Sequence, residues 1–194
     1  MIIDDVKICN ALAEVGINVS NIYDLVNTKQ SYPAAIPILI ELLDDSFTNS
    51  KIVEGIVRSL TVKDARGKAN KRLLKLYFDT PKSEKGLRWV IGNAFATIIT
   101  TEDEDVILKI VNDPSNGESR RMFVFALGKI KSKQVEETLI QLLDDKEVAL
   151  HAISALRRLR VLRALPRIEK LASSSSSGVK KAAKGFLKKF ARKS

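Results

Sequence analysis

The segment LIELLDD at residues 39–45 recurs at residues 139–145 as LIQLLDD, and these two copies mark a repeated unit. Weaker copies lie at residues 73–77, 107–111 and 168–172. Successive copies are about 29 to 34 residues apart, a length typical of a two-helix unit in solenoid proteins. The repetition therefore predicts helix pairs stacked in sequence.

Each copy is followed by a second segment whose apolar residues are spaced by 0, 3, 4 and 7 positions. This spacing places them on one face of a helix. Alanine is frequent in the second column, where a small side chain lets neighbouring helices approach closely. In the segments 52–60, 90–98, 122–130, 151–159 and 182–190 the four columns are Val53, Ile91, Phe123, Ala152 and Ala183; Ile56, Ala94, Ala126, Ala155 and Phe186; Val57, Phe95, Leu127, Leu156 and Leu187; and Leu60, Ile98, Ile130, Leu159 and Phe190.

Residues that stop or cap helices separate the predicted helices, and residues 2–15 and 19–27 supply one further, divergent pair. We therefore expect an all-α fold of about six helix pairs in a single domain spanning residues 1–194. It would comprise a capping pair at residues 1–30, five repeats at 31–190 and a basic tail at 191–194. The serine run 173–177, with Gly178, predicts a flexible surface loop inside the last pair,.

The net charge of +10 is concentrated near the C-terminus. Residues 146–194 contain fourteen Lys and Arg but only two acids, whereas residues 1–145 have a net charge of −2. A local excess of this kind suggests an anionic partner, namely nucleic acid, an acidic protein or a membrane surface. A solvated helix face with a basic tail explains it equally well, and both interpretations stay open.

The single cysteine, Cys9, cannot form an internal disulfide and favours a reducing cytoplasm,. Cys9 shares an apolar helical stripe with Val6 and Ala13, so we expect it to pack in the core. No apolar run approaches the eighteen residues of a membrane-spanning helix. The acidic start of the chain does not resemble a secretory signal, and we expect a cytoplasmic protein.

The segment RMFVFALGKI at residues 121–130 resembles the second helix of HEAT repeats, particularly the short type first described in phycobilisome lyases. The resemblance extends less completely over about residues 33–190. It implies a right-handed α-α superhelix whose second helices line the concave side. It also implies that Arg88 and Arg120, in one column with Lys180, bond to the turn within a helix pair.

The residues that catalytic HEAT-like proteins would need are missing. The only histidine, His151, is followed by Ala152, which does not match the His-Glu pairs of deoxyhypusine hydroxylase. The single tryptophan, Trp89, is not part of a motif that resembles the alkylpurine DNA glycosylase site. His151 lies in an apolar column, where we expect a core histidine with its hydrogen bonds satisfied. The acidic residues 102–105 lie at the start of a predicted helix, where they stabilise its positive end. We therefore expect no catalytic residue, metal or cofactor.

The face of the second helices opposite the core is the candidate binding surface. Its middle column, Gly55, Asn93, Phe125, Ser154 and Gly185, is mostly small or polar and leaves room for a partner. Aromatic and arginine side chains in such a place are typical of binding hot spots, although Trp89 and Phe125 would equally fill gaps between helices. The predicted partner-binding residues are Trp89, Asn93, Arg121, Phe125, Arg157, Lys181 and Lys188, with Lys180, Lys184 and Lys189 as candidate anion-binding residues.

Three functions are considered for the protein. The favoured one is a non-catalytic scaffold that holds an acidic or extended protein segment. The alternative is sequence-nonspecific nucleic-acid binding through the basic C-terminal region, and an enzyme related to HEAT-like lyases or DNA glycosylases ranks third. A basic stripe across all repeats would favour nucleic acid, whereas positive charge confined to one end favours a protein.

Overall fold

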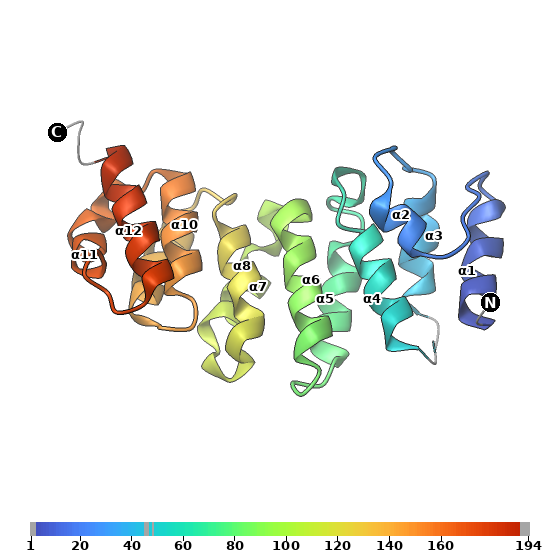
Figure 1. The fold of residues 1–194 in the computed structure, drawn as a ribbon, viewed down its shortest axis with the longest axis horizontal. Coiled ribbons are helices and arrows are strands. Elements are labelled where there is room, and N and C mark those ends of the chain that lie inside the picture. Colours follow the sequence, from blue (N-terminus) through green and yellow to red (C-terminus); the bar gives the residue numbers. More distant parts are fainter. Residues whose placement is uncertain (1–2, 45–46, 48, 191–194) are drawn as a thin grey trace. The chain divides into compact units, whose positions relative to one another are not determined.

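The computed structural model describes residues 3–44, 47 and 49–190. All the regular structure in these residues is helical and comprises twelve α-helices with short 3-10 turns between some of them (Figure 1). The predicted all-α fold of six helix pairs is confirmed. The chain divides into two compact units, residues 1–98 and 99–194, and the prediction of one continuous domain stays a prediction.

The first unit contains three helix pairs. The second helices of these pairs pack in succession, α2 against α4 and α4 against α6, while α1 packs against α3 on the other side. Side chains buried between the two layers, such as Leu39, Ile56 and Phe95, form the core of the unit. The helices are α1 (Ile3–Ala13), α2 (Tyr23–Asn27), α3 (Ala35–Leu42), α4 (Ser50–Ser59), α5 (Asn70–Asp79) and α6 (Lys85–Ile98).

The second unit repeats this arrangement. Its second helices pack α8 against α10 and α10 against α12, and α7 packs against α9 in the other layer. The helices are α7 (Glu104–Asn112), α8 (Arg120–Leu127), α9 (Lys133–Gln141), α10 (Ala149–Leu159), α11 (Leu165–Leu171) and α12 (Ser177–Phe190). None of the described helices in either unit is long and apolar enough to span a membrane.

The predicted apolar columns form the core. The second column is buried throughout: Ile56, Ala94, Ala126, Ala155 and Phe186 are at most 1% exposed. Four positions depart from the prediction, and the first of them, Leu159 at the end of α10, is half-buried. Val53 is only half-buried, because Ile52 takes the core position at the start of α4. Leu187 and Phe190 are half-buried on α12, whose outer side no further described repeat covers.

Two buried arginines close the turns within their helix pairs, as the resemblance implied. Arg88 Nη1 donates to the carbonyl oxygens of Tyr77 at 2.9 Å and Thr80 at 2.8 Å. Arg120 donates to the carbonyl oxygens of Val111 at 3.0 Å and Gly117 at 3.1 Å. Each guanidinium therefore satisfies carbonyls that the end of a helix leaves without a partner.

Arg120 also reaches the next repeat, where its Nη2 lies 2.9 Å from a carboxylate oxygen of Asp145. Because Arg120 is only 3% exposed, this ion pair is shielded from water and its loss is costly. Lys180, which occupies the equivalent column in the last repeat, is exposed and plays no such role.

Two local expectations are wrong. In α1 the buried residues are Ile8 and Leu12, so the core stripe lies one position before the expected one, and Cys9 is only half-buried. Burial, followed by the nearby carboxylates of Asp5 and Asp24, raises the pKa of the Cys9 thiol. A smaller fraction of the thiol is therefore ionised to the reactive thiolate. At the other end, residues 173–176 lie between α11 and α12 as predicted, but α12 begins at Ser177, so Ser177 and Gly178 belong to its first turn.

Candidate binding surface of the second helices

In the second unit, α10 and α12 lie side by side and run in the same direction. A Cβ built on Gly178 would lie 3.6 Å from Leu150 Cδ2, and one on Gly185 would lie 3.4 Å from Arg157 Nη1. The two contacts are separated by seven residues on each helix, which is two turns. Glycine on α12 thus lets the side chains of α10 lie close to the α12 backbone.

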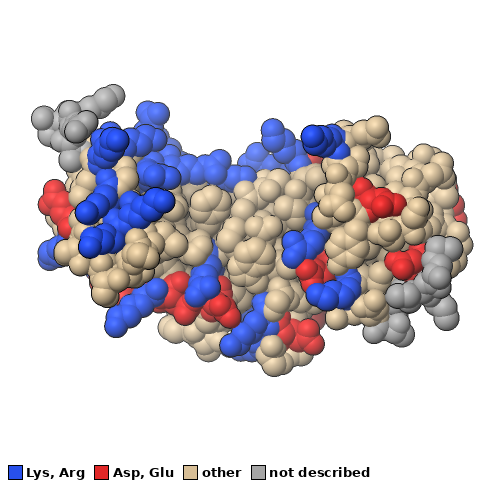
Figure 2. Space-filling model, in the orientation of Figure 1, with Lys and Arg blue, Asp and Glu red and all other residues tan. Residues whose placement is uncertain are grey.

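The exposed side of these two helices is strongly positive. Neither α10 nor α12 contains an acidic residue. Figure 2 shows Lys and Arg side chains gathered over α12 and the adjoining part of α10. We call this surface the basic face; its residues are exposed and comprise Arg157, Lys180, Lys181, Lys184, Lys188 and Lys189.

Some basic residues elsewhere in the same unit have acidic partners. Arg163, beside α11, lies 3.2 Å from a carboxylate oxygen of Glu136, and Arg167 pairs with Asp144. Among the described residues, no ion pair joins Arg157, Lys181, Lys184 or Lys188 to an acid. The basic face therefore carries positive charge that no ion pair with a described acid balances.

The neighbouring helix α8 presents a different surface. Arg121, a predicted partner-binding residue, is half-exposed and its Nη1 lies 3.1 Å from a carboxylate oxygen of Glu118. Its guanidinium also pairs with the carboxylate of Glu147 and donates to the Glu147 carbonyl oxygen. Phe125, one turn further along α8, is half-buried. The charge of Arg121 is thus balanced, and the basic face ends at α10.

His151 adjoins this ion-pair cluster and is not the satisfied core residue that its column predicted. The side chain is half-buried, and its Nδ1 is buried without a hydrogen-bond partner among the described residues. Burial, and then the positive charge of Arg121, lowers the pKa of His151, while Glu147 opposes this shift. In the described residues no three His, Cys, Asp or Glu side chains gather as metal ligands would.

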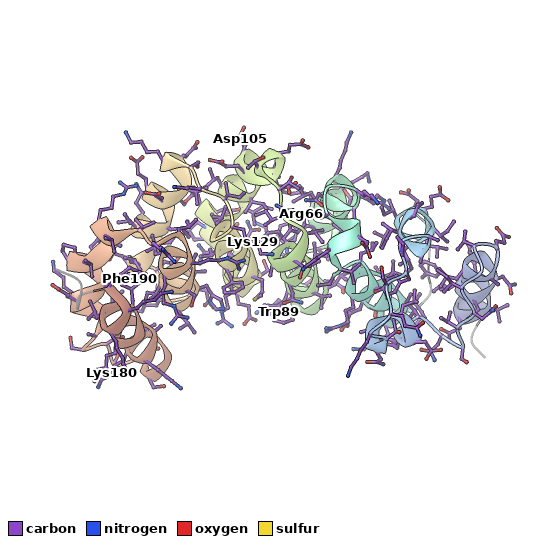
Figure 3. The ribbon with its side chains drawn as sticks, turned by 90° about the horizontal axis from the view of Figure 1, so that it is seen from above. Arg66, Trp89, Asp105, Lys129, Lys180 and Phe190 are labelled. Carbon is purple, nitrogen blue, oxygen red and sulfur yellow. The ribbon has the colours of Figure 1, made fainter. Side chains whose placement is uncertain are left out.

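In the first unit the candidate residues are Trp89 and Asn93, one turn apart on α6. Trp89, labelled in Figure 3, is 36% exposed. Asn93 is half-buried. The patch predicted from Trp89, Asn93, Arg121 and Phe125 draws on both units, and its assembly stays a prediction.

Gly55, which was expected to line an open groove, lies in a helix contact instead, as does Gly128 at the end of α8. A Cβ on Gly55 would fall 2.5 Å from Ile22 Cγ2, and one on Gly128 would fall 2.8 Å from the Cα of Ala155. Both are buried. Gly185 differs, because the atom nearest to it belongs to an exposed arginine. Sequence reasoning did not find the acids that hold Arg121, although the i,i+3 spacing of Glu118 and Arg121 is a recognisable signal.

Comparison with known proteins supports the fold. The crystal structure of an engineered protein is similar, with a TM-score of 0.52 and 18% sequence identity over 96% of this chain. This chain spans 58% of the length of that protein. No curated protein matches the sequence. Residues 104–188, which include α7 to α11 and most of α12, match the HEAT-repeat family. This match confirms the resemblance to HEAT repeats first noted at residues 121–130, and it covers most of the second unit.

Proposed function

We propose that this chain is a non-catalytic binding scaffold that holds an acidic, extended segment of a protein partner on the basic face. Two observations on α10 and α12 support the proposal. These helices contain no acidic residue, and they expose four cations that have no ion pair among the described residues, namely Arg157, Lys181, Lys184 and Lys188. HEAT repeats generally serve as protein-interaction scaffolds, which is consistent with this role. A reducing cytoplasm suits a chain with the single cysteine Cys9.

A protein partner is favoured over nucleic acid because the free cations of the basic face do not continue onto the neighbouring helix α8. A nucleic-acid backbone presents evenly spaced phosphates and is best neutralised by a continuous track of cations. On α8, however, Arg120 is paired with Asp145, and Arg121 is paired with two glutamates. An acidic protein segment needs only a local cluster of cations. Phe125, on the neighbouring helix α8, would add an apolar contact to a longer segment.

The proposal is tested with two pools of degenerate peptides, one with a central run of Glu and Asp and one with Ser and Gln. Fluorescence anisotropy should show selective binding of the acidic pool. Replacing Lys181, Lys184 and Lys188 with Gln should weaken this binding about tenfold or more.

The matched control replaces Lys63, Lys68 and Lys71, three exposed lysines of the first unit, with Gln. This variant has the same change in net charge and should retain binding. Equal loss of binding in both variants would show that binding depends only on net charge, and would contradict the proposal. Preferential binding of single-stranded nucleic acid, with steep salt dependence, would support the alternative function.

A further inference from the structure

The centre of the basic face is a cluster of three cations around a glycine. The Arg157 guanidinium reaches from α10 to α12 and lies where a Cβ on Gly185 would contact it, 3.4 Å from Nη1. Gly185 is half-buried, whereas Arg157 is exposed. A side chain at position 185 would occupy the space beside the guanidinium, so glycine keeps this space open.

Two lysines of α12 flank the same point. Lys181 precedes Gly185 by four residues and Lys188 follows it by three, and both spacings place side chains on one side of a helix. Lys181 and Lys188 are exposed. The long side chains of both lysines can therefore reach the space over Gly185, which the Arg157 guanidinium borders.

This cluster suits an anion with more than one charge. An arginine fork binds two oxygens of a phosphate or carboxylate at once, and each lysine adds a point charge. A carboxylate has one negative charge and two oxygens, whereas a phosphomonoester has nearly two charges and three acceptor oxygens. Three cations without an acid on either helix match the phosphomonoester better.

We propose that Arg157, Lys181 and Lys188 form a site for a phosphorylated serine or threonine in the segment held by the basic face. The inference rests on the proposed function and specifies the chemistry that the segment carries. Leu150 supports a peptide as the carrier. It is 37% exposed and lies near the start of α10, where its Cδ2 would be 3.6 Å from a Cβ on Gly178 of α12.

The distance between these two points makes the proposal more specific. Leu150 and Arg157 are seven residues apart on α10, or roughly 10 Å at the helical rise. An extended peptide covers this distance in about three residues. The segment should therefore carry an apolar side chain three positions from its phosphorylated residue.

The test uses a degenerate peptide pool with one fixed central phosphoserine, and matching pools with Ser or Glu at that position. Anisotropy should show the phosphoserine pool binding about tenfold more tightly than the Glu pool. Sequencing of the peptides that the immobilised protein retains should show enrichment of apolar residues three positions from the phosphoserine. Phosphatidylserine vesicles and a single-stranded oligonucleotide serve as competing anions.

Two substitutions on adjacent residues provide the matched comparison. Arg157→Lys retains the charge but removes the fork, and should reduce phosphoserine binding about tenfold. Arg158→Lys changes an equally exposed arginine on the same helix and should leave it unchanged. Gly185→Glu places a carboxylate beside Arg157 and should abolish binding, and circular dichroism checks that each variant remains folded.

The outcomes separate this inference from the proposed function. Equal binding of the phosphoserine and Glu pools would overturn the phosphate site and leave the acidic-segment scaffold standing. Binding of neither pool would overturn both. Equal effects of Arg157→Lys and Arg158→Lys, or tighter binding of the vesicles or the oligonucleotide at this site, would overturn the phosphopeptide assignment.

Discussion

Gly128 of α8 and Ala155 of α10 bring two helix backbones into direct contact. A Cβ on Gly128 would fall 2.8 Å from the Cα of Ala155, a distance that real Cβ atoms essentially never show. Ala155 is itself 1% exposed. Small residues on both helices thus set how closely the second helices of successive repeats can pack.

Enlarging Ala155, or Ala126 in the same column, should destabilise the fold. Ala155→Leu, or Ala126→Leu in the same column, should lower the free energy of unfolding by about 1–3 kcal/mol, because the added carbons have no space between the helices. Urea denaturation measures this change. Ala13→Leu, at an exposed position of α1, should stay within about 0.5 kcal/mol of the wild type. An unchanged midpoint for Ala155→Leu would contradict the close packing.

Arg120 and Arg121 are adjacent but should differ sharply in their contribution to stability. Arg120→Ala removes a buried partner of Asp145 and of two carbonyl oxygens, and should cost about 3–5 kcal/mol,. Arg121→Ala breaks half-exposed ion pairs with Glu118 and Glu147, and should cost about 1 kcal/mol or less,. Chemical denaturation of the two variants, side by side, checks this. Similar losses of stability in the two variants would show that the burial of Arg120 does not make its ion pair more important than those of Arg121.

Trp89 and Phe125 test whether the second helices form a recognition surface. If they contact a partner, alanine at either position should abolish binding of the acidic peptide pool and change stability little. Phe95→Ala, at a fully buried position of α6, should instead cost about 3–5 kcal/mol. Peptide binding and urea denaturation on the same samples separate the two roles. A loss for Trp89→Ala as large as that for Phe95→Ala would assign Trp89 to packing.

His151 should make the protein less stable as the pH falls. Its folded-state pKa is lowered, chiefly by burial and then by Arg121, so the folded state binds fewer protons than the unfolded chain. The stability that depends on neutral His151 is present above its ordinary pKa of about 6.5 and is lost progressively below it. His151→Gln should therefore show a shallower fall in melting temperature between pH 7.5 and 5.5. Parallel curves for the two proteins would be evidence against this linkage.

The core of the protein could be predicted from the sequence because each apolar column is a property of one helix. Ala126 and Ala155 follow the helical period, and their burial needs no knowledge of the neighbouring helix. The turn-closing roles of Arg88 and Arg120 were likewise implied by the repeat.

The surface depends on neighbours that the sequence does not reveal. Gly55 and Gly185 occupy the same column, yet Ile22 covers one and the exposed Arg157 borders the other. Arg121 has the same basic character as Lys181, but its charge is balanced by Glu118 and Glu147, the second of which comes from the next repeat. Which residues of a repeated column face solvent is therefore decided by side chains about 30 residues away.

The position of Arg120 also bears on how the repeats open. Its guanidinium bonds to the turn between α7 and α8 and to Asp145, which precedes α10. In stacked repeats, stability is the sum of each repeat and its contacts with its neighbours. A buried ion pair across one such boundary makes separate opening of either side costly. Amide protons of α8 and α10 should accordingly exchange with solvent in a single cooperative event.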